Sequence, residues 1–151
     1  MTLESALREH KFTQGLTDSQ IASLAALATE VAFDENEMIL EDRERSRAFF
    51  LVTAGSVAVE LRTPRFVVCV EAVAAGQAFG WSALLDQHDT AFQVRAREYT
   101  VALRLDGPAL RALCHRDPAL GVEVLHRVLY LVAGRVRSTE IRFAEMCGVK
   151  V

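Results

Sequence analysis

The sequence contains no run of about eighteen apolar residues, so nothing in it is predicted to cross a membrane. The first eleven residues are polar and hold no apolar core of a signal peptide. An excess of basic residues is also missing, since 17 Lys and Arg face 20 Asp and Glu, a formal net charge of -3. Nucleic-acid binding needs surplus Lys and Arg. We therefore expect a cytoplasmic protein without general affinity for nucleic acid or membranes.

Cysteine is scarce, and the three residues Cys69, Cys114 and Cys147 stand far apart. A disulfide framework favours a denser, even set, and a structural zinc site favours C-x-x-C spacing. An iron–sulfur or redox site needs a tight cluster that this spacing does not supply. We interpret the three cysteines as free thiols, packed or partly exposed.

Enzyme motifs are absent as well: we find no nucleophile elbow, no P-loop and no catalytic carboxylate pair with supporting context. No H-x-H with a following carboxylate occurs, which argues against a metalloenzyme. His88 is interpreted as a solvated loop residue, and His115 as a helix-end residue near the negative end of the helix dipole. The sequence predicts no catalytic and no metal-binding residues.

A capping box gives the first positive signal. Thr17 precedes Gln20 by three residues, and Leu16 with Ile21 fits the hydrophobic staple around them. We predict a helix that ends near Glu30 and carries one apolar face. That face consists of Ile21, Leu24, Leu27 and Ala28.

The hydrophobic period then changes to two, from Val31 to about Leu105. Short apolar or alternating segments occur at 48–52, 57–61, 66–70, 92–96 and 99–105, separated by turn residues. No helical pattern intervenes, so parallel α/β architecture is excluded. The pattern predicts an antiparallel sandwich or barrel.

Helical patterns return at Asp106, which opens a short helix carrying Leu110 and Leu113. Asp117-Pro118 reads as an N-cap followed by proline at the first helical position. The helix that follows runs almost thirty residues, or roughly 45 Å. It carries two apolar stripes, which we call the inner and the outer stripe. The inner stripe is Leu120, Val124, Val128 and Leu131, and the outer stripe is Val122, Leu125, Leu129, Val132, Val136, Thr139 and Phe143.

The outer stripe alternates spacings of three and four, as the seam of a coiled coil does. We expect the inner stripe to pack on the β domain and the outer stripe to meet a second copy of the chain in a homodimer. The alternative is one broad face buried within a single domain.

A segment in the middle of the chain carries a family resemblance. Residues 76–85, GQAFGWSALL, are followed by AFQVRA at 91–96, and FFLV at 49–52 precedes Gly55 and VAV at 57–59. This order resembles the phosphate-binding cassette and the preceding strand-turn-strand of the Crp/Fnr-type cyclic nucleotide-binding domain family.

The resemblance implies a mainly β fold with flanking α-helices: a double-stranded β-helix, or jelly-roll β-roll, with an N-terminal helix and a long C-terminal helix. We expect one domain over 1–151, with N-terminal helical residues 1–30, a β-roll over 31–105 and C-terminal helices over 106–147. The cassette spans 76–96.

The same resemblance names a ligand site. In the family, a Glu after the cassette glycine holds the ribose and an Arg pairs with the cyclic phosphate. Here Trp81 stands in place of the Glu, and the Arg position falls on Asp89 or Thr90, depending on the alignment. Gly80 would let the backbone approach a phosphate, and the short helix after it would point N–H groups at an anion. The candidate ligand-binding residues are Gly80, Trp81, Ser82, Ala83, Asp89, Thr90 and Ala91.

With both polar anchors replaced, ordinary cyclic AMP binding is not expected, because an Arg–phosphate contact contributes about 1.5–3 kcal/mol. Trp81 could stack on a ring or plug the cavity. Relatives that hold haem do so through His or Cys, for which His115 beside Cys114 is the open alternative. Transcription factors of the family carry a helix-turn-helix module after the long helix, and the sequence stops at Val151, so we expect no direct DNA binding.

The function predicted is a non-catalytic regulatory or sensor module. It would bind a cyclic nucleotide, a nucleotide-like molecule or another anionic ligand weakly or atypically, and need no other cofactor. It would dimerise through the long helix and act on an unidentified protein partner. The alternative is a ligand-free structural or protein-interaction module with a dead pocket.

Overall fold

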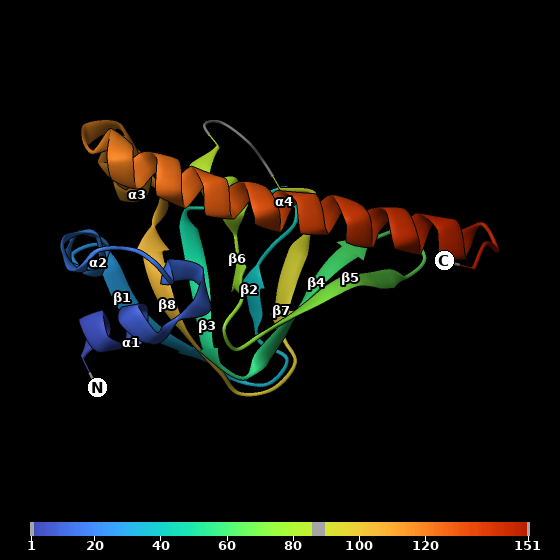
Figure 1. Cartoon of the computed structure of the whole chain (residues 1–151). Coiled ribbons are helices and arrows are strands. Elements are labelled where there is room, and N and C mark those ends of the chain that lie inside the picture. Colours follow the sequence, from blue (N-terminus) through green and yellow to red (C-terminus); the bar gives the residue numbers. More distant parts are fainter. Residues whose placement is uncertain (1, 86–89, 151) are drawn as a thin grey trace.

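The computed structural model describes residues 2–85 and 90–150. Figure 1 shows a layer of strands with helices at one end and one long helix lying across it. The strands form two four-stranded antiparallel sheets, with orders β1-β8-β3-β6 and β2-β7-β4-β5. The expected fold class, a mainly β roll with flanking helices, is confirmed.

The strand bounds place the cassette between the sheets. The first sheet contains β1 (Ala28–Phe33), β3 (Ala48–Ala54), β6 (Ala78–Phe79) and β8 (Thr100–Asp106). The second contains β2 (Met38–Leu40), β4 (Ser56–Arg62), β5 (Val67–Ala74) and β7 (Gln93–Ala96). The cassette, residues 76–96, contains β6, which pairs with β3 of the first sheet, and β7, which pairs with β4 of the second sheet. It therefore connects the two sheets.

Two hydrophobic clusters hold the layers together. One lies between the sheets and includes the stacked rings of Phe50 and Phe79, whose centroids are 4.7 Å apart. The other lies between the first sheet and the helices, around Phe49 and Leu103. Burial of such apolar side chains stabilises the fold by roughly 1.5–3 kcal/mol each.

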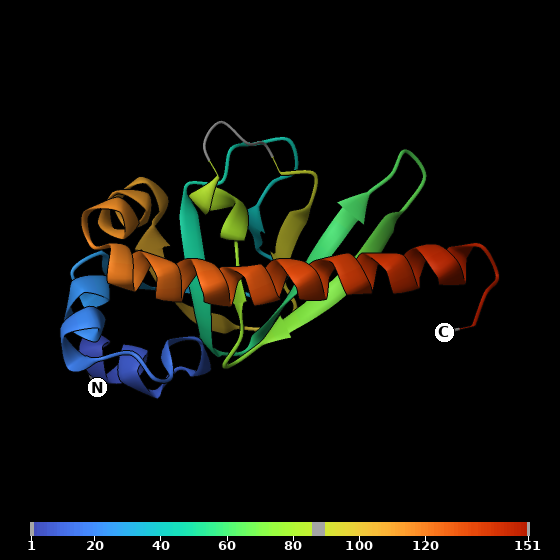
Figure 2. The ribbon, with the colours of Figure 1, turned by 45° about the horizontal axis from the view of Figure 1, so that its top comes forward.

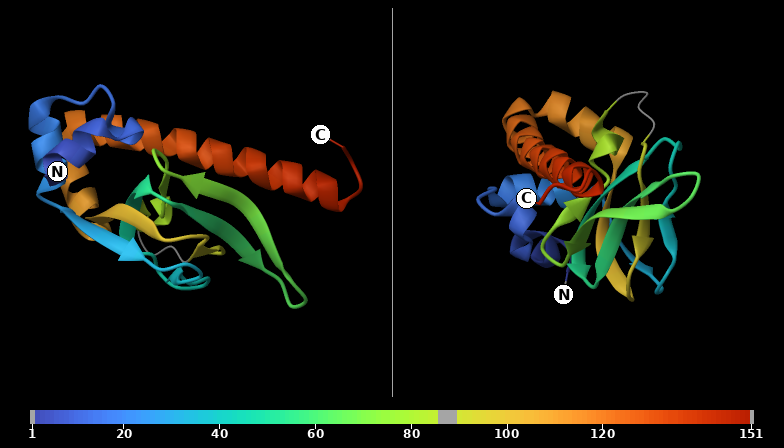
Figure 3. Two further views of the ribbon diagram at one scale, coloured as in Figure 1. Left: turned by 90° about the horizontal axis from the view of Figure 1, so that it is seen from below. Right: turned by 90° about the vertical axis from the view of Figure 1, so that its right-hand side faces the viewer.

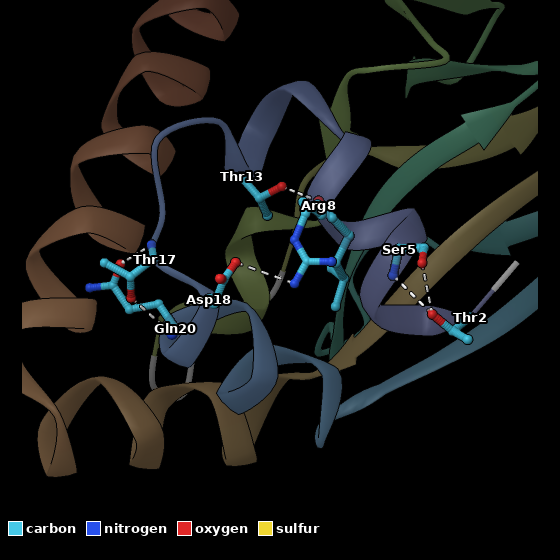
Figure 4. Close-up of polar contacts among 8 residues, drawn as sticks. Thr2, Ser5, Arg8, Thr13, Thr17, Asp18 and Gln20 are labelled. Atoms are coloured by element: carbon cyan, nitrogen blue, oxygen red, sulfur yellow. Dashed lines mark hydrogen bonds and ion pairs between the residues drawn. The ribbon is translucent and has the colours of Figure 1, made fainter.

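The N-terminal segment contains α1 (Leu3–Glu9), the 3-10 helix η1 (Lys11–Thr13) and α2 (Asp18–Ala25). Figure 4 shows the capping box, in which the Gln20 N–H donates to Thr17 Oγ1 and the Thr17 N–H donates to Gln20 Oε1. An ion pair of 3.3 Å between Arg8 and Asp18 links α1 to α2.

The predicted end of this helix near Glu30 is wrong. The helix stops at Ala25, and β1 begins at Ala28 and pairs with β8 along its whole length. Leu27 and Ala28, expected on the helix face, therefore lie in the turn and the strand. Helix α1 lies within the helical residues expected over 1–30, although no separate helix was specified there, because the polar sequence offers only Leu3, Ala6 and Leu7 as an apolar side.

The segments with alternating hydrophobicity do form strands, but the buried residues of these strands do not simply alternate, and two strand ends differ from the expected ones. In β4, Val57, Ala58 and Val59 are all buried, since this strand lies between its neighbours β5 and β7 under other elements. Phe66, expected in a strand, is exposed in the turn before β5. Tyr99 is exposed, and β8 begins at Thr100.

The C-terminal helices begin where predicted. The carboxylate of Asp106 accepts from the Ala109 N–H at the start of α3 (Gly107–Arg116), and that of Asp117 accepts from the Leu120 N–H at the start of α4 (Pro118–Met146). Helix α4 has 29 residues. None of the described helices combines the length and apolar character that a bilayer crossing needs.

Helix α4 crosses the whole molecule and extends past the body of the roll. In Figures 2 and 3 its C-terminal end and the β4–β5 hairpin both project away from the N-terminal helices. Its first turns pack closely on α3, where a Cβ added to Gly121 would lie 2.5 Å from the Cys114 carbonyl oxygen. Glycine at this position therefore permits the close approach of the two helices.

Candidate functional site

The cassette turn is built around Gly80. Its φ of +86° lies in the left-handed region, and it precedes the 3-10 helix η2 (Trp81–Leu84). A Cβ at Gly80 would lie 2.7 Å from the Ala48 carbonyl oxygen of β3. The sequence prediction assigned this glycine to phosphate approach. The structure gives a second reason, because contact with β3 alone requires glycine here.

Next to this turn lies a pocket of about 190 Å³, which we call the cassette pocket. Five of the predicted ligand residues line it together: Gly80, Trp81, Ser82, Thr90 and Ala91. Ala83 does not line it and lies instead beside Gly107 of α3. Asp89 lies outside the described residues. The remaining lining is Leu40, Val59, Phe92, Val94 and Arg135.

The polar groups contributed by the cassette are few and partly engaged. The Thr90 hydroxyl accepts from the Phe92 N–H at 3.1 Å, and the Thr90 N–H donates to the Glu44 carbonyl oxygen at 3.3 Å. Ser82 is buried. Trp81 is partly buried and packs against the cluster under the helices, so its ring forms a wall of the pocket.

The cation of the pocket comes from α4. The Arg135 side chain is only 10% exposed, and its guanidinium carbon lies 5.1 Å from the Phe92 ring centre and 5.9 Å from that of Trp81. Both distances fall within the range of cation–π attraction. The sequence analysis missed this residue.

Arg135 also forms an ion pair with Glu71 of β5. Nη2 donates to Glu71 Oε1 at 3.4 Å, and Nε lies 3.4 Å from Oε2. The Nε atom is nevertheless buried without an aligned hydrogen-bond acceptor among the described residues. The guanidinium of Arg135, which lines the cassette pocket, thus has an incomplete set of hydrogen bonds.

Glu71 faces a second and larger space. A groove of about 500 Å³, which we call the outer groove, runs between α4, β5, the β5–β6 turn and η1. Glu71, Lys11 and Arg127 line it. The Arg135–Glu71 pair therefore stands between the outer groove, which Glu71 lines, and the cassette pocket, which Arg135 lines.

Arg95 of β7 and Arg97, which follows the strand, do not belong to the site. Arg95 pairs with Glu60 at 3.5 Å and donates to the Asn36 carbonyl oxygen at 3.0 Å. Arg97 is exposed. Neither side chain lines the cassette pocket.

Histidine and cysteine residues lie apart from the site. His10 is buried: its Nδ1 accepts from the Phe12 N–H at 3.1 Å, and its Nε2 lies 2.9 Å from the Val52 carbonyl oxygen, to which it donates. Burial lowers the pKa of His10, against a raising contribution from the carbonyl groups of Val52 and Gln77. His88 lies outside the described residues.

The described cysteines carry no disulfide, in line with the free thiols expected. Cys69 and Cys147 are exposed, whereas burial, followed by the nearby Asp117 charge, raises the pKa of the Cys114 thiol. Among residues 2–85 and 90–150, no three His, Cys, Asp or Glu side chains gather as a metal site requires.

The two stripes of α4 have different surroundings. Leu120, Val124 and Val128 of the inner stripe are buried in the core. In the outer stripe the exposed fraction is 67% at Val122, 53% at Leu125, 63% at Leu129, 51% at Val136 and 71% at Phe143. Val132, predicted in the outer stripe, packs partly against the core instead. The alternative of one broad buried face is therefore wrong for this chain.

Comparison with known proteins supports the family resemblance. The chain is 28% identical over 134 residues to a provisionally named potassium channel protein of Rhodopseudomonas palustris; the match covers 88% of this chain and 31% of that protein. The chain thus spans about a third of that relative's length.

Solved structures give the same fold. A provisionally named cyclic nucleotide-binding protein from Geobacter metallireducens superposes with a TM-score of 0.78 at 25% identity, covering 90% of this chain and 99% of that one. The N-terminal domain of a transcriptional regulator from Streptomyces coelicolor superposes with a TM-score of 0.68 at 22% identity, covering 89% and 94%. The family model for the cyclic nucleotide-binding domain matches residues 30–117, which is more than half of the sequence and includes both sheets and the cassette. The chain belongs to the cyclic nucleotide-binding domain family.

Proposed function

We propose that this domain is a non-catalytic sensor whose cassette pocket binds a small nucleotide-like or other anionic ligand in an atypical way, and whose helix α4 transmits the result. One observation carries the proposal: a side chain of α4, Arg135, forms part of the pocket wall. A ligand that enters the pocket must contact or displace this side chain. Occupancy of the pocket is thereby coupled to the helix.

The binding mode must be atypical because neither family anchor is available. Trp81 has no group that could accept a ribose hydroxyl proton, and the Thr90 hydroxyl is engaged within its own loop. The pocket of about 190 Å³ is also smaller than the roughly 300–1,000 Å³ of ordinary ligand sites. A small ligand fits this space better than an intact nucleotide, for which the Arg135 side chain would have to move.

Homodimerisation through α4 is the second part of the proposal. The exposed outer stripe offers aliphatic and aromatic side chains along several turns, which is more than a monomeric surface usually leaves uncovered. A second copy of the same stripe is a self-complementary partner. We place the dimer in the cytoplasm, where a partner protein would recognise the shift of α4.

A regulatory role fits the settings in which relatives occur. One relative is named as a potassium channel protein, and a structural neighbour is the N-terminal domain of a transcriptional regulator. These two proteins have different outputs. We infer that the present domain likewise supplies a regulatory signal rather than a reaction.

A ligand-free interaction module is the alternative, and one observation favours it. Arg135 already contacts Trp81, Phe92 and Glu71, so the protein's own side chains satisfy part of what a ligand would otherwise contact. In that case α4 and its outer stripe would serve docking alone.

Ligand titration separates the two functions. Trp81 is the one tryptophan of the sequence and lines the pocket, so its fluorescence reports occupancy directly. We expect cyclic AMP, cyclic GMP or a smaller phosphate or carboxylate to change Trp81 emission and raise the melting temperature. At 100 times its dissociation constant, a ligand stabilises the fold by about 2.7 kcal/mol. If a panel of nucleotides and small anions leaves both signals unchanged at millimolar concentration, the interaction module is the correct function.

A further inference from the structure

The proposed function leaves open which residue holds the negative charge of a ligand, and Arg135 meets the requirements. It is the cation that lines the described part of the cassette pocket, and it is nine-tenths buried. Its Nε hydrogen has no aligned acceptor among the described residues, although a buried guanidinium strongly favours complete hydrogen bonding. An oxyanion in the pocket would supply the guanidinium with a further acceptor.

The present partner of Arg135 is held loosely. Both contacts to Glu71 are 3.4 Å long, whereas a charge-assisted hydrogen bond is typically about 2.7–2.9 Å. The pair therefore gives Arg135 charge compensation without a tight bidentate bond. A phosphate or carboxylate of the right size could form the shorter bonds that Glu71 does not.

Breaking the ion pair costs less free energy at Glu71 than at Arg135. The Glu71 side chain is 24% exposed and lines the outer groove, where water and Lys11 can compensate its charge. Arg135 has no such access to solvent, and an unpaired buried charge is strongly unfavourable. An exchange of partners is therefore open to Arg135 only if another anion arrives in the pocket.

We propose that Arg135 replaces the missing cassette arginine as the anion-binding residue, and that an oxyanion ligand, a phosphate or carboxylate on a small apolar body, takes Arg135 from Glu71. This inference rests on the proposed ligand-sensing function and adds its regulation. Without ligand, the pair ties α4 to β5. With ligand, α4 is tied to the cassette instead.

Two variants that break the same ion pair must then change affinity in opposite directions. Arg135→Gln removes the anion-binding group and should weaken binding of phenyl phosphate and cyclic AMP by at least about tenfold. Glu71→Gln removes the competitor and should tighten binding about fivefold, the factor that corresponds to about 1 kcal/mol. Arg142→Gln, which breaks the exposed 3.0 Å pair with Glu145 on the same helix, is the matched control and should leave affinity unchanged.

Binding affinities are measured by calorimetry and Trp81 fluorescence, with phenyl phosphate, benzoate, cyclic AMP and adenosine as probes. Circular dichroism first establishes that each variant is folded. Phenyl phosphate against benzoate distinguishes phosphate from carboxylate ligands, and adenosine lacks the charge. If Arg135→Gln does not fold, Arg135→Lys retains the charge without the fork and should weaken phosphate binding by a smaller factor.

Each result decides the matter. If adenosine binds the wild type as tightly as cyclic AMP, or if the Arg135 and Glu71 variants shift affinity in the same direction, Arg135 is not the anion-binding residue although the pocket still senses a ligand. If neither the wild type nor Glu71→Gln binds any probe, the sensing function itself is wrong.

Discussion

The two faces of α4 differ in their surroundings: one face packs into the core of its own domain, and the other exposes apolar side chains. Both stripes are rich in Leu and Val, yet Leu120, Val124 and Val128 of the inner stripe are buried among core residues, and five residues of the outer stripe are more than half exposed. Composition alone does not distinguish them. The difference lies in what each face meets. The inner stripe packs into the core formed with the first sheet, α3 and the N-terminal segment, whereas Val122 and Leu125 of the outer stripe only line a pocket beside α3.

The largest expected effect contrasts one leucine on each face. Leu120→Ala should lower the free energy of unfolding by about 2–5 kcal/mol, because Leu120 is fully buried and its removal leaves a cavity. Leu129→Ala should change it by less than about 0.5 kcal/mol in dilute protein, since that side chain is 63% exposed. Urea denaturation measures both. Equal losses would mean that the outer face is buried within the protomer.

Two glycines of α4 should respond to the same substitution with opposite signs. Gly121→Ala would bring a methyl group within 2.5 Å of the Cys114 carbonyl oxygen and should destabilise the protein by about 1–3 kcal/mol. A Cβ added at Gly134 would meet no described atom within 4 Å apart from its own stretch of helix, so Gly134→Ala should stabilise by about 0.5–1 kcal/mol through helix propensity. Thermal unfolding gives both values. A stable Gly121→Ala protein would show that α3 and α4 are not tightly packed.

The free energy of unfolding should depend on pH through His10, which holds part of the core cluster that packs against the inner stripe. Phe12, in the cluster that contacts α4, has its N–H bonded to His10 Nδ1, and protonation of that nitrogen would break the bond. Burial holds the pKa of folded His10 below the ordinary value near 6.5, so the unfolded chain takes up the proton first. Stability should therefore be complete above about pH 6.5 and fall as the pH drops below it.

Urea midpoints from pH 7.5 to pH 5 test this expectation, with His10→Gln as the comparison. The variant should start less stable but lose less on acidification. A wild type and variant with parallel pH profiles would show that His10 does not carry the effect.

Substitutions in the outer stripe should have the smallest effect on protomer stability. Their effect should appear in the oligomeric state. Leu129→Glu combined with Val136→Glu should alter protomer stability by less than about 0.5 kcal/mol, because both side chains are exposed. Sedimentation should nevertheless detect folded monomers in place of dimers. Arg137→Glu, at an exposed polar position of the same helix, is the control. An unchanged mass for the double variant would contradict the dimer proposal.

Patterns among residues close in sequence predicted the starts of α2, α3 and α4 and the positions of most strands. The Thr17–Gln20 capping box and the Asp117-Pro118 start of α4 depend on neighbours in sequence and were predicted correctly. The end of α2 was not, because the ladder between β1 and β8 joins residues far apart in the chain and overrides the helical spacing of Leu27 and Ala28. Burial along β4, where Val57, Ala58 and Val59 are all buried, likewise depends on contacts with elements far away in the sequence.

The site was predicted only as far as the cassette reaches. Gly80, Trp81, Ser82, Thr90 and Ala91 are close in sequence and do line one pocket. Arg135 comes from a helix 45 residues beyond Thr90, and no local pattern connects it with the cassette. A signal did exist, because Arg135 follows Leu131 by four residues and so continues the inner stripe. A charge at a buried position of a helix indicates a specific partner.

The Arg135–Glu71 pair has a consequence for ionic strength. Salt screens charges that are exposed to solvent far more than those that are buried. Arg142 and Glu145, each 47% exposed, should separate in concentrated salt, whereas Arg135 at 10% exposure should keep its contact with Glu71. The Arg135–Glu71 pair should thus persist across the salt concentrations that a cell experiences, and respond to the chemical identity of an anion rather than to the total concentration of ions.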